Sequence, residues 1–312
     1  MPKLLILSRQ AEEYQHLLES ADLPEIQIFP ATEVVKAKAL DPDFEIVFGE
    51  PRLMREVLPG LPRLRWVQSM YAGVEHLLDP ALRRDYMLTN ARGVFGTLMS
   101  EYVFGYLLNH ERRIFERRQA QQEHRWDGST TGMLRGKTIG LLGVGSIGAH
   151  LARTADFFEM TVRGYTRSSE SCPAVDVYFH GGRLLDFANG LDYLVSVLPN
   201  TSGTRHIVDA ALLEALPPRA VFVNVGRGSA LDESALIHAL ETKRIAAAVL
   251  DVFEQEPLPK DHPFWEAPNL LMTFHTSAPS LTADIAGLFI ENYRLYLNRK
   301  ELLHRVDFGR GY

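Results

Sequence analysis

The sequence contains one cysteine, no long apolar run and no excess of positive charge, and each shortage excludes a class of protein. With only Cys172 in 312 residues, the chain has no internal disulfide, and a cysteine-based metal site is not expected. No segment approaches the roughly 18 apolar residues needed to cross a bilayer. Because 39 acidic residues outnumber 33 basic ones, the net charge of -6 provides no basic field for nucleic acid or an anionic membrane.

What remains is the composition of a soluble globular protein, with 46% hydrophobic and 23% charged residues. The length suits two domains of ordinary size. Near the N-terminus, the apolar run Leu4–Leu7 is too short for the core of a signal peptide and is typical of a buried strand. We therefore expect a cytoplasmic protein with no nucleic-acid partner, no membrane association and no metal site.

Short apolar runs alternate with helical patterns along the chain, which favours βαβ units around parallel sheets. The predicted strands are Lys3–Leu7, Glu45–Phe48, Arg65–Ser69, Thr138–Leu142, Thr161–Tyr165, Tyr193–Leu198, Ala220–Val225, Ala246–Val252 and Leu270–Phe274. The predicted helices are Glu12–Ser20, Thr97–Arg113, Ser146–Phe158, Glu233–Glu241 and Ser280–Arg299. The six strands from Thr138 onward suit a doubly wound sheet. The polar segment Gln119–Thr131 is interpreted as a surface crossing between domains.

A glycine-rich turn, Gly143-Val144-Gly145-Ser146-Ile147-Gly148, joins a predicted strand to a predicted helix. Gly143 permits a tight turn, Gly145 lets the backbone approach a pyrophosphate, and Gly148 lets the helix pack on the strand. The phosphates would meet free N–H groups at the positive end of the helix dipole. The strand–loop–helix context favours a dinucleotide site over an ordinary glycine-rich turn.

The next predicted strand is followed by Thr166-Arg167-Ser168. An enzyme that uses NAD usually places an Asp or Glu about 20 residues beyond the glycine loop, where it bonds the ribose 2′-hydroxyl. Here no carboxylate occurs before Glu170. An arginine between hydroxyls suits a 2′-phosphate, because a guanidinium makes bidentate charged contacts. We predict NADP(H) as the preferred coenzyme, with NAD(H) possible; the alternative for Arg167 is a solvated surface side chain.

Three residues able to carry chemistry, Arg227, Glu256 and His275, each follow one of the last three predicted strands. Ligands of open α/β sheets bind outside the carboxyl ends of the strands. Taken singly, each residue has an ordinary interpretation as a loop or surface side chain. Their shared sheet edge with the glycine loop favours a catalytic site.

At these motifs the chain resembles the D-isomer-specific 2-hydroxyacid dehydrogenase family. The matching segments are Tyr71–Glu75, Ser100–Tyr102, Gly143–Gly148, Asn224–Gly228, Leu250–Phe253 with Glu256-Pro257, and His275. They occur in order along nearly the whole chain, which makes the resemblance specific. Within the family, the chain is most similar to bacterial glyoxylate/hydroxypyruvate reductases that use NADPH, in Arg167-Ser168, in Asp251 through Pro263 and in the ending Arg310-Gly311-Tyr312.

The resemblance implies two Rossmann-like α/β domains, each a doubly wound parallel sheet, in a chain that forms a homodimer. The coenzyme-binding domain, residues 98–279, would be inserted into a substrate domain made of residues 1–97 and 280–312. The substrate would lie in the cleft between the domains. The residue patterns alone predict only an N-terminal and a C-terminal domain, so the discontinuous division rests on the resemblance.

The implied reaction is hydride transfer between NAD(P)H and a small 2-keto acid, which gives the D-2-hydroxy acid. His275 would donate a proton to the carbonyl oxygen. Glu256 would orient the imidazole and raise its pKa. Arg227 would hold the substrate carboxylate and polarise the ketone.

Further ligand contacts are expected in both domains. Backbone N–H groups of Ala72, Gly73 and Val74 would hold the substrate carboxylate. Coenzyme contacts are expected from Gly143, Gly145, Ser146, Ile147, Gly148, Thr166, Arg167, Ser168, Leu198, Pro199, Val225, Gly226 and Asp251. By resemblance Asp251 would face the nicotinamide carboxamide; the alternative is a turn residue at the end of a strand.

The residues on either side of His275 leave the substrate open, and two other classes of protein are alternatives. Family members usually have proline before the catalytic histidine and a small or apolar residue after it, whereas this chain has Phe274 and Thr276. The alternatives are a related dehydrogenase, such as a phosphoglycerate or formate dehydrogenase, and a nucleotide-sensing binding protein on a dehydrogenase scaffold. We expect no long regulatory extension after Tyr312, which argues against the regulated phosphoglycerate type. Retention of all three chemical residues argues against a binding protein.

Overall fold

A computed structural model describes residues 1–311, and the chain divides into two compact units. Met1–Val94 and the residues from Ser280 onward form the first unit, and Phe95–Pro279 forms the second, which is therefore inserted into the first along the chain. The second unit starts before the predicted Leu98, because a helix that begins at Gly96 belongs to it as a whole. Tyr312, part of the ending used for the resemblance, lies outside the described residues.

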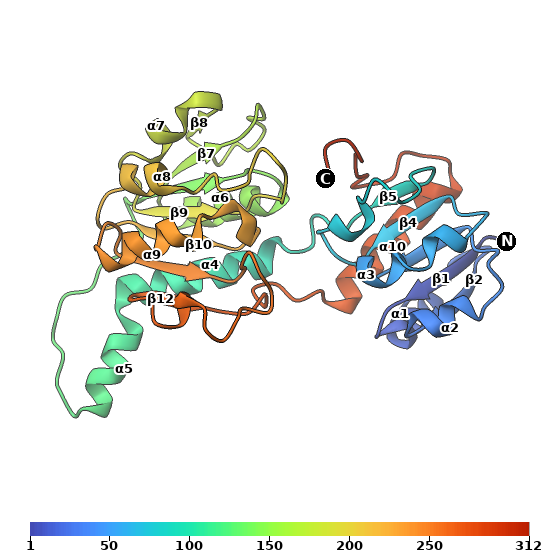
Figure 1. Cartoon of the computed structure of the whole chain (residues 1–312), viewed down its shortest axis with the longest axis horizontal. Coiled ribbons are helices and arrows are strands. Elements are labelled where there is room, and N and C mark those ends of the chain that lie inside the picture. Colours follow the sequence, from blue (N-terminus) through green and yellow to red (C-terminus); the bar gives the residue numbers. More distant parts are fainter. Residues whose placement is uncertain (312) are drawn as a thin grey trace. The chain divides into compact units, whose positions relative to one another are not determined.

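The first unit is a five-stranded parallel sheet with helices (Figure 1). Its elements are β1 (Lys3–Leu7), α1 (Ala11–Ser20), β2 (Gln27–Ala31), α2 (Val34–Lys38), β3 (Ile46–Gly49), α3 (Pro51–Met54), β4 (Trp66–Ser69), β5 (Met87–Thr89) and α10 (Thr282–Leu297). The strand order is β2-β1-β3-β4-β5, so the winding reverses between β1 and β3 as in a doubly wound fold.

The C-terminal helix α10 completes the core of the first unit. Phe289 is fully buried and stacks on Trp66, with ring centroids 5.1 Å apart and planes 6° apart. The hydroxyl of Tyr293 donates to the carbonyl oxygen of Pro24 at 2.9 Å. The apolar face of α10 thus packs against the sheet formed by the first part of the chain, so the two ends of the sequence belong to one unit.

The second unit contains a seven-stranded parallel sheet. Its elements are α4 (Gly96–Arg112), α5 (Ile114–Gln122), β6 (Thr138–Leu142), α6 (Ser146–Phe157), β7 (Thr161–Tyr165), β8 (Val177–Phe179), α7 (Leu184–Ala188), β9 (Tyr193–Ser196), α8 (Ala210–Ala215), β10 (Val221–Asn224), α9 (Glu233–Glu241), β11 (Ala247–Leu250) and β12 (Leu270–Met272). The order β12-β11-β10-β9-β6-β7-β8 reverses between β6 and β9. Ligands of such sheets bind at this switch point.

Helices cover both faces of this sheet, so its central strands are buried on both sides. In β9, Tyr193 and Val195 pack with residues of α4 and α6, whereas Leu194 packs with residues of α7, α8 and α9. This explains why the central strands appear in the sequence as continuous apolar runs rather than as alternating ones. Within residues 1–311, no helix combines the length and the apolar character that a membrane span requires.

The predicted strand and helix bounds are confirmed for β1, β6, β7 and α9. Three strands were missed: β2, β5 and β8. All three lie at the edge of a sheet and are partly exposed, and β5 and β8 are only three residues long, so their apolar runs are too short to stand out in the sequence. Pro30 in β2 also makes a strand harder to predict from the sequence, because proline has no N–H to donate; an edge strand tolerates it.

The interpretation of Gln119–Thr131 as a crossing between domains is wrong. The left-handed backbone of Arg113 (φ 52°) ends α4, and α5 follows and reaches into this polar segment. The segment then returns to its own unit, because the N–H of Gly132 donates to the carbonyl oxygen of Glu111 at 2.9 Å. Figure 1 shows α5 and the loop after it projecting from the rest of the second unit as an arm.

Candidate active site

The glycine loop leaves β6 at the switch point of the second sheet. Gly143 has φ +96°, a left-handed conformation that glycine adopts without steric cost. A Cβ atom on Gly148 would lie 2.2 Å from the carbonyl oxygen of Gly143, so helix α6 can pack this closely only with glycine there. A Cβ on Gly145 would meet open space, and α6 begins at the next residue, Ser146. The loop therefore presents the start of a helix, with its free N–H groups, to an open position.

The ends of β9 and β10 border this loop. A Cβ on Gly226 would lie 2.6 Å from the backbone nitrogen of Leu198, and one on Gly143 would lie 3.3 Å from the Leu198 side chain. Pro199 follows Leu198, and Val225 precedes Gly226 and is buried. The residues predicted to touch the coenzyme after β6, β9 and β10 therefore lie together at one sheet edge.

His275 and Glu256 form a hydrogen-bonded pair in the second unit. The imidazole Nδ1 of His275 lies 2.8 Å from Oε2 of Glu256. The other carboxylate oxygen, Oε1, accepts from the backbone N–H of Phe253 at 3.0 Å, which fixes the carboxylate plane. Because an ionised carboxylate can only accept, Nδ1 carries the proton and Nε2 remains for another partner. The His275 side chain is 53% exposed, so solvent or a ligand can reach it.

The hydrogen bond between them favours the charged forms of both side chains, the imidazolium of His275 and the carboxylate of Glu256. The hydrogen bond that His275 donates to Glu256 raises the pKa of His275, while burial and the positive charge of Arg227 oppose the rise. Burial alone would raise the pKa of Glu256, but the hydrogen bonds from His275 and from the Phe253 N–H outweigh it and lower that pKa. The ionised carboxylate therefore keeps the imidazole protonated to a higher pH than in water.

Arg227 joins the same group of side chains. Its guanidinium lies near enough to lower the pKa of both His275 and Glu256, and its Nη1 donates to the carbonyl oxygen of Gly226 at 2.8 Å. The amide of Asn224, at the end of β10, donates to the Arg227 carbonyl oxygen at 3.1 Å. An arginine, a carboxylate and a histidine that are far apart in the sequence thus meet at the carboxyl ends of β10, β11 and β12.

Asp251 supports the backbone around His275, a role that the sequence did not reveal. The Asp251 side chain is fully buried and accepts from the Thr273 hydroxyl at 2.5 Å and from the N–H groups of Thr276 and Ser277 at 2.9 and 3.1 Å. Its backbone oxygen accepts from the His275 N–H at 2.7 Å. His275 itself has φ 57°, uncommon for a residue with a side chain. We call these contacts the Asp251 network; they hold His275 in that conformation.

The network extends to α4, and an exposed aromatic side chain directly precedes His275. The Tyr102 hydroxyl lies 2.7 Å from the Thr273 hydroxyl, which itself donates to Asp251. Phe274 is 57% exposed, and its ring lies 5.7 Å from that of Trp265. The residue in place of the family's usual proline therefore presents an aromatic surface beside the histidine.

The remaining predicted residues follow β7, which is the neighbour of β6, and β4 of the first unit. Thr166, Arg167 and Ser168 follow β7, beyond the glycine loop, and the last two are exposed. Ala72–Val74 lie in the first unit, in the loop after β4. There the carbonyl oxygen of Ala72 accepts from the Asn90 amide at 2.8 Å, which holds this loop against the residues that follow β5.

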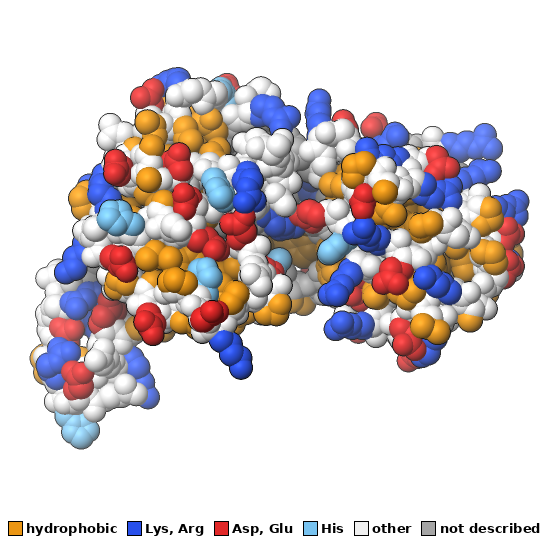
Figure 2. Space-filling view, in the orientation of Figure 1, with side chains coloured by type: hydrophobic (Ala, Val, Ile, Leu, Met, Phe, Trp, Pro, Cys, Tyr) orange, Lys and Arg blue, Asp and Glu red, His pale blue; other side chains and the backbone are white. Residues whose placement is uncertain are grey.

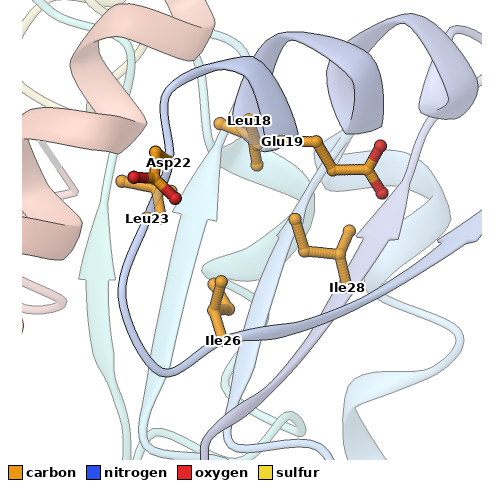
Figure 3. Close-up of a pocket in the computed structure, with 6 residues that line it drawn as sticks. All are labelled: Leu18, Glu19, Asp22, Leu23, Ile26 and Ile28. Atoms are coloured by element: carbon orange, nitrogen blue, oxygen red, sulfur yellow. The ribbon is translucent and has the colours of Figure 1, made fainter.

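One surface pocket is unrelated to this site (Figure 3). It lies in the first unit, between the end of α1 and β2, and its lining residues are Leu18, Glu19, Asp22, Leu23, Ile26 and Ile28. The two charged members, Glu19 and Asp22, are both acidic, so the pocket would repel an anion. Figure 2 shows Lys and Arg mixed with Asp and Glu over the visible face, so local groups such as Arg227 rather than a broad field would attract an anion.

The fold and the site define a dinucleotide-dependent dehydrogenase with a doubly wound nucleotide unit. Residues 104–277 match the family described as D-isomer specific 2-hydroxyacid dehydrogenase, NAD binding domain. The chain is 34% identical over 248 residues to a glyoxylate/hydroxypyruvate reductase A of Serratia proteamaculans, a match covering 77% of this chain and 78% of that one.

Two solved structures extend the similarity over the whole chain. A D-isomer specific 2-hydroxyacid dehydrogenase family protein of Aeromonas salmonicida is 42% identical, with a TM-score of 0.92 and coverage of 98% and 99% of the two chains. A D-isomer specific 2-hydroxyacid dehydrogenase of Xanthobacter autotrophicus, in complex with NADPH and MES, is 30% identical, with a TM-score of 0.89 and coverage of 100% and 99%. The chain belongs to the D-isomer-specific 2-hydroxyacid dehydrogenase family, and the predicted resemblance is confirmed.

Proposed function

We propose that the protein reduces a small 2-keto acid of the glyoxylate or hydroxypyruvate type to the D-2-hydroxy acid, with NADP(H) as the preferred coenzyme and NAD(H) as a weaker one. The observation that carries this proposal is the hydrogen-bonded pair His275–Glu256 beside Arg227, on the sheet edge that also bears the glycine loop. The second unit is the coenzyme domain, and the first unit is the substrate domain.

The chemistry of the site follows from its own groups. The reduced nicotinamide, when bound, supplies the hydride. Negative charge then grows on the carbonyl oxygen, and Nε2 of His275 delivers a proton to it. Glu256 keeps Nδ1 protonated and offsets the imidazolium charge, so that the acid form persists to a higher pH than in a free imidazole.

Substrate binding uses the guanidinium and the backbone. Arg227 pairs with the substrate carboxylate and polarises the ketone, because its planar fork matches two oxygens at once. Backbone N–H groups of Ala72–Val74 hold the carboxylate from the substrate domain. Asp251 accepts three hydrogen bonds from the loop after β12, which bears His275, and we propose that it acts mainly by holding that loop, with any contact to the nicotinamide carboxamide secondary.

The residues around the glycine loop fit a dinucleotide. Helix α6 begins beside the open position at Gly145, where a pyrophosphate would meet N–H groups and the positive end of the helix dipole. Thr166, Arg167 and Ser168 would hold the 2′-phosphate. The NADPH complex of the Xanthobacter relative supports this coenzyme.

We also propose a cytoplasmic homodimer. In the arm that projects from the second unit, Ile114 and Phe115 are 51% and 53% exposed, and Trp126 is 96% exposed. Apolar side chains on a projecting helix are typical of a surface that a second copy covers.

A steady-state screen of glyoxylate, hydroxypyruvate, formate and larger 2-keto acids, with NADPH and NADH in parallel, tests the proposal. We expect turnover of the smallest 2-keto acids with NADPH, and little activity with formate. Faster oxidation of NADH than of NADPH with every substrate would overturn the coenzyme assignment. Coenzyme binding without turnover of any substrate would favour the nucleotide-sensing alternative.

A further inference from the structure

A histidine that the sequence did not single out lies beside the predicted 2′-phosphate loop. Strands β7 and β8 are neighbours, with Tyr165 opposite Phe179, so the next residues, Thr166 and His180, meet at the sheet edge. Nδ1 of His180 lies 2.9 Å from the carbonyl oxygen of Thr166 and 3.1 Å from its hydroxyl. Since a carbonyl oxygen can only accept, Nδ1 carries a proton there.

The other ring nitrogen faces a carboxylate. Nε2 of His180 lies 2.7 Å from Oε1 of Glu170, which belongs to the same loop as Arg167 and Ser168. The Tyr178 ring stacks on the imidazole, with planes 8° apart and centroids 6.3 Å apart. The imidazole is therefore held on several sides, whereas the Glu170 side chain is 59% exposed and can move into solvent.

The surroundings favour a charged imidazole. The hydrogen bond that His180 donates to Glu170 raises the pKa of His180, and the one to the Thr166 carbonyl adds to the rise. Besides Glu170, Tyr178 on β8 lies beside the imidazole, the Arg183 N–H on the following turn donates to the His180 carbonyl oxygen at 3.2 Å, and Arg167 belongs to the same loop as Glu170. The Arg183 guanidinium lies over the Phe179 ring and pairs with Asp186, so it is engaged away from the loop.

We propose that His180 is a specificity-determining residue that recognises the 2′-phosphate of NADP(H), and that Glu170 is an internal anion which the phosphate displaces. This inference rests on the proposed coenzyme. A phosphate is a stronger acceptor than one carboxylate oxygen, because it carries nearly two charges and three free oxygens. The phosphate would accept the hydrogen bond from Nε2–H in place of the carboxylate, while the Glu170 side chain turns outward into solvent. NAD(H) has only a hydroxyl at this position and cannot displace a carboxylate, so the pair discriminates between the two coenzymes.

Binding titrations of the whole protein by calorimetry test the proposal without requiring turnover. NADP+ and NAD+ are titrated into the wild type, His180→Gln, Glu170→Gln and a control, His238→Gln. His238 is an exposed histidine on α9 of the same unit. Measurements between pH 7 and pH 9 keep the 2′-phosphate a dianion, since its second pKa is near 6.

We expect His180→Gln to weaken NADP+ binding about tenfold at pH 7, the worth of one charge-assisted hydrogen bond, and to change NAD+ binding less than about twofold. Glu170→Gln removes the competing anion but also lowers the pKa of His180, so its NADP+ affinity relative to the wild type should be highest at pH 7 and should decline as the pH rises. In the wild type, NADP+ affinity should fall as the pH rises through the pKa of His180, and in Glu170→Gln the fall should begin at a lower pH. The His180→Gln variant should lose this pH dependence, and His238→Gln should behave as the wild type.

Two outcomes would overturn the inference, and only the second would also overturn the coenzyme assignment. If the wild type binds NADP+ and His180→Gln binds it equally well, His180 does not read the phosphate, although the coenzyme assignment stands. If the wild type binds NAD+ but not NADP+, the coenzyme assignment falls together with the inference. Unchanged NAD+ binding by each variant shows that the nucleotide unit is folded.

Discussion

Nδ1 of His275 lies 2.8 Å from Oε2 of Glu256, although Glu256 follows β11 and His275 follows β12. The two strands are parallel neighbours, so their carboxyl ends open on the same edge of the sheet. This contact fixes which imidazole nitrogen carries the proton toward the carboxylate and which one is left for chemistry.

Replacing His275 with alanine should lower kcat for glyoxylate reduction by roughly two to four orders of magnitude, the usual contribution of a positioned acid–base group. Coenzyme affinity should change little, because the glycine loop and the end of β7 remain intact. Steady-state kinetics and a fluorescence titration with NADPH measure the two effects. A variant that reduces glyoxylate at nearly the wild-type rate would refute the role of His275.

Glu256→Gln should shift the pH profile of the reaction. Reduction needs the imidazolium, so its kcat falls as the pH rises through the pKa of His275, which Glu256 raises. Without the carboxylate that pKa drops, and the fall should begin at a lower pH than in the wild type. Oxidation of the hydroxy acid needs neutral imidazole, and its rise should move to lower pH as well. Profiles of kcat in both directions check this; identical profiles in the two proteins would remove Glu256 from the mechanism.

Arg227→Lys should reduce kcat/KM for glyoxylate by at least about tenfold while the positive charge is kept. The ammonium is a compact point charge and cannot bind two carboxylate oxygens as the guanidinium fork does. Comparison with Arg227→Ala separates the effect of shape from that of charge, and the alanine variant should lose more. Equal kcat/KM in the lysine variant and the wild type would show that bidentate binding is not used.

Asp251→Asn should lower the free energy of unfolding by about 1–3 kcal/mol. The buried amide N–H2 group cannot accept a hydrogen bond, so one of the backbone N–H groups that now donates to the carboxylate would lose its acceptor. The substitution should also lower kcat, since the loop that bears His275 loses its support. Tyr102→Phe removes only the outermost bond of the Asp251 network and should have the smaller effect on both. Urea unfolding measures the stability, and Asp186→Asn, an exposed site on α7, provides the control. A fully stable Asp251→Asn would contradict the account.

Charges placed on the arm should separate the proposed dimer. Ile114→Asp with Phe115→Asp would put two carboxylates into an apolar contact, where their desolvation is unfavourable. Light scattering coupled to gel filtration should then show the mass of one chain, against two for the wild type. Val35→Asp, at an apolar residue of the first unit that is 76% exposed, should leave the mass unchanged. A monomeric wild type would refute the homodimer.

Several elements were predictable because their pattern is local. The strands β6 and β7 begin and end where the sequence predicts. In β6 the reason is that a strand between two helix layers has apolar residues on both faces. The edge strand β8 has an apolar run of only three residues, and its omission concealed His180, which directly follows it. The arm was misread because a polar helix that projects from its unit has few buried residues to reveal it; in α5 only Ala120 is buried.

The sequence by itself determined the glycine loop, the order of the central strands along the chain, and the placement of Arg227, Glu256 and His275 after three of those strands. These follow from spacing and from the rule that parallel strands share one carboxyl edge. Only the tertiary structure decided which atoms meet: Nδ1 of His275 with Glu256, the carboxylate of Asp251 with the Thr276 N–H, and Nε2 of His180 with Glu170. A hydrogen bond forms or fails over a few tenths of an ångström, and that placement is set by packing among residues distant in the sequence, which no local periodicity encodes.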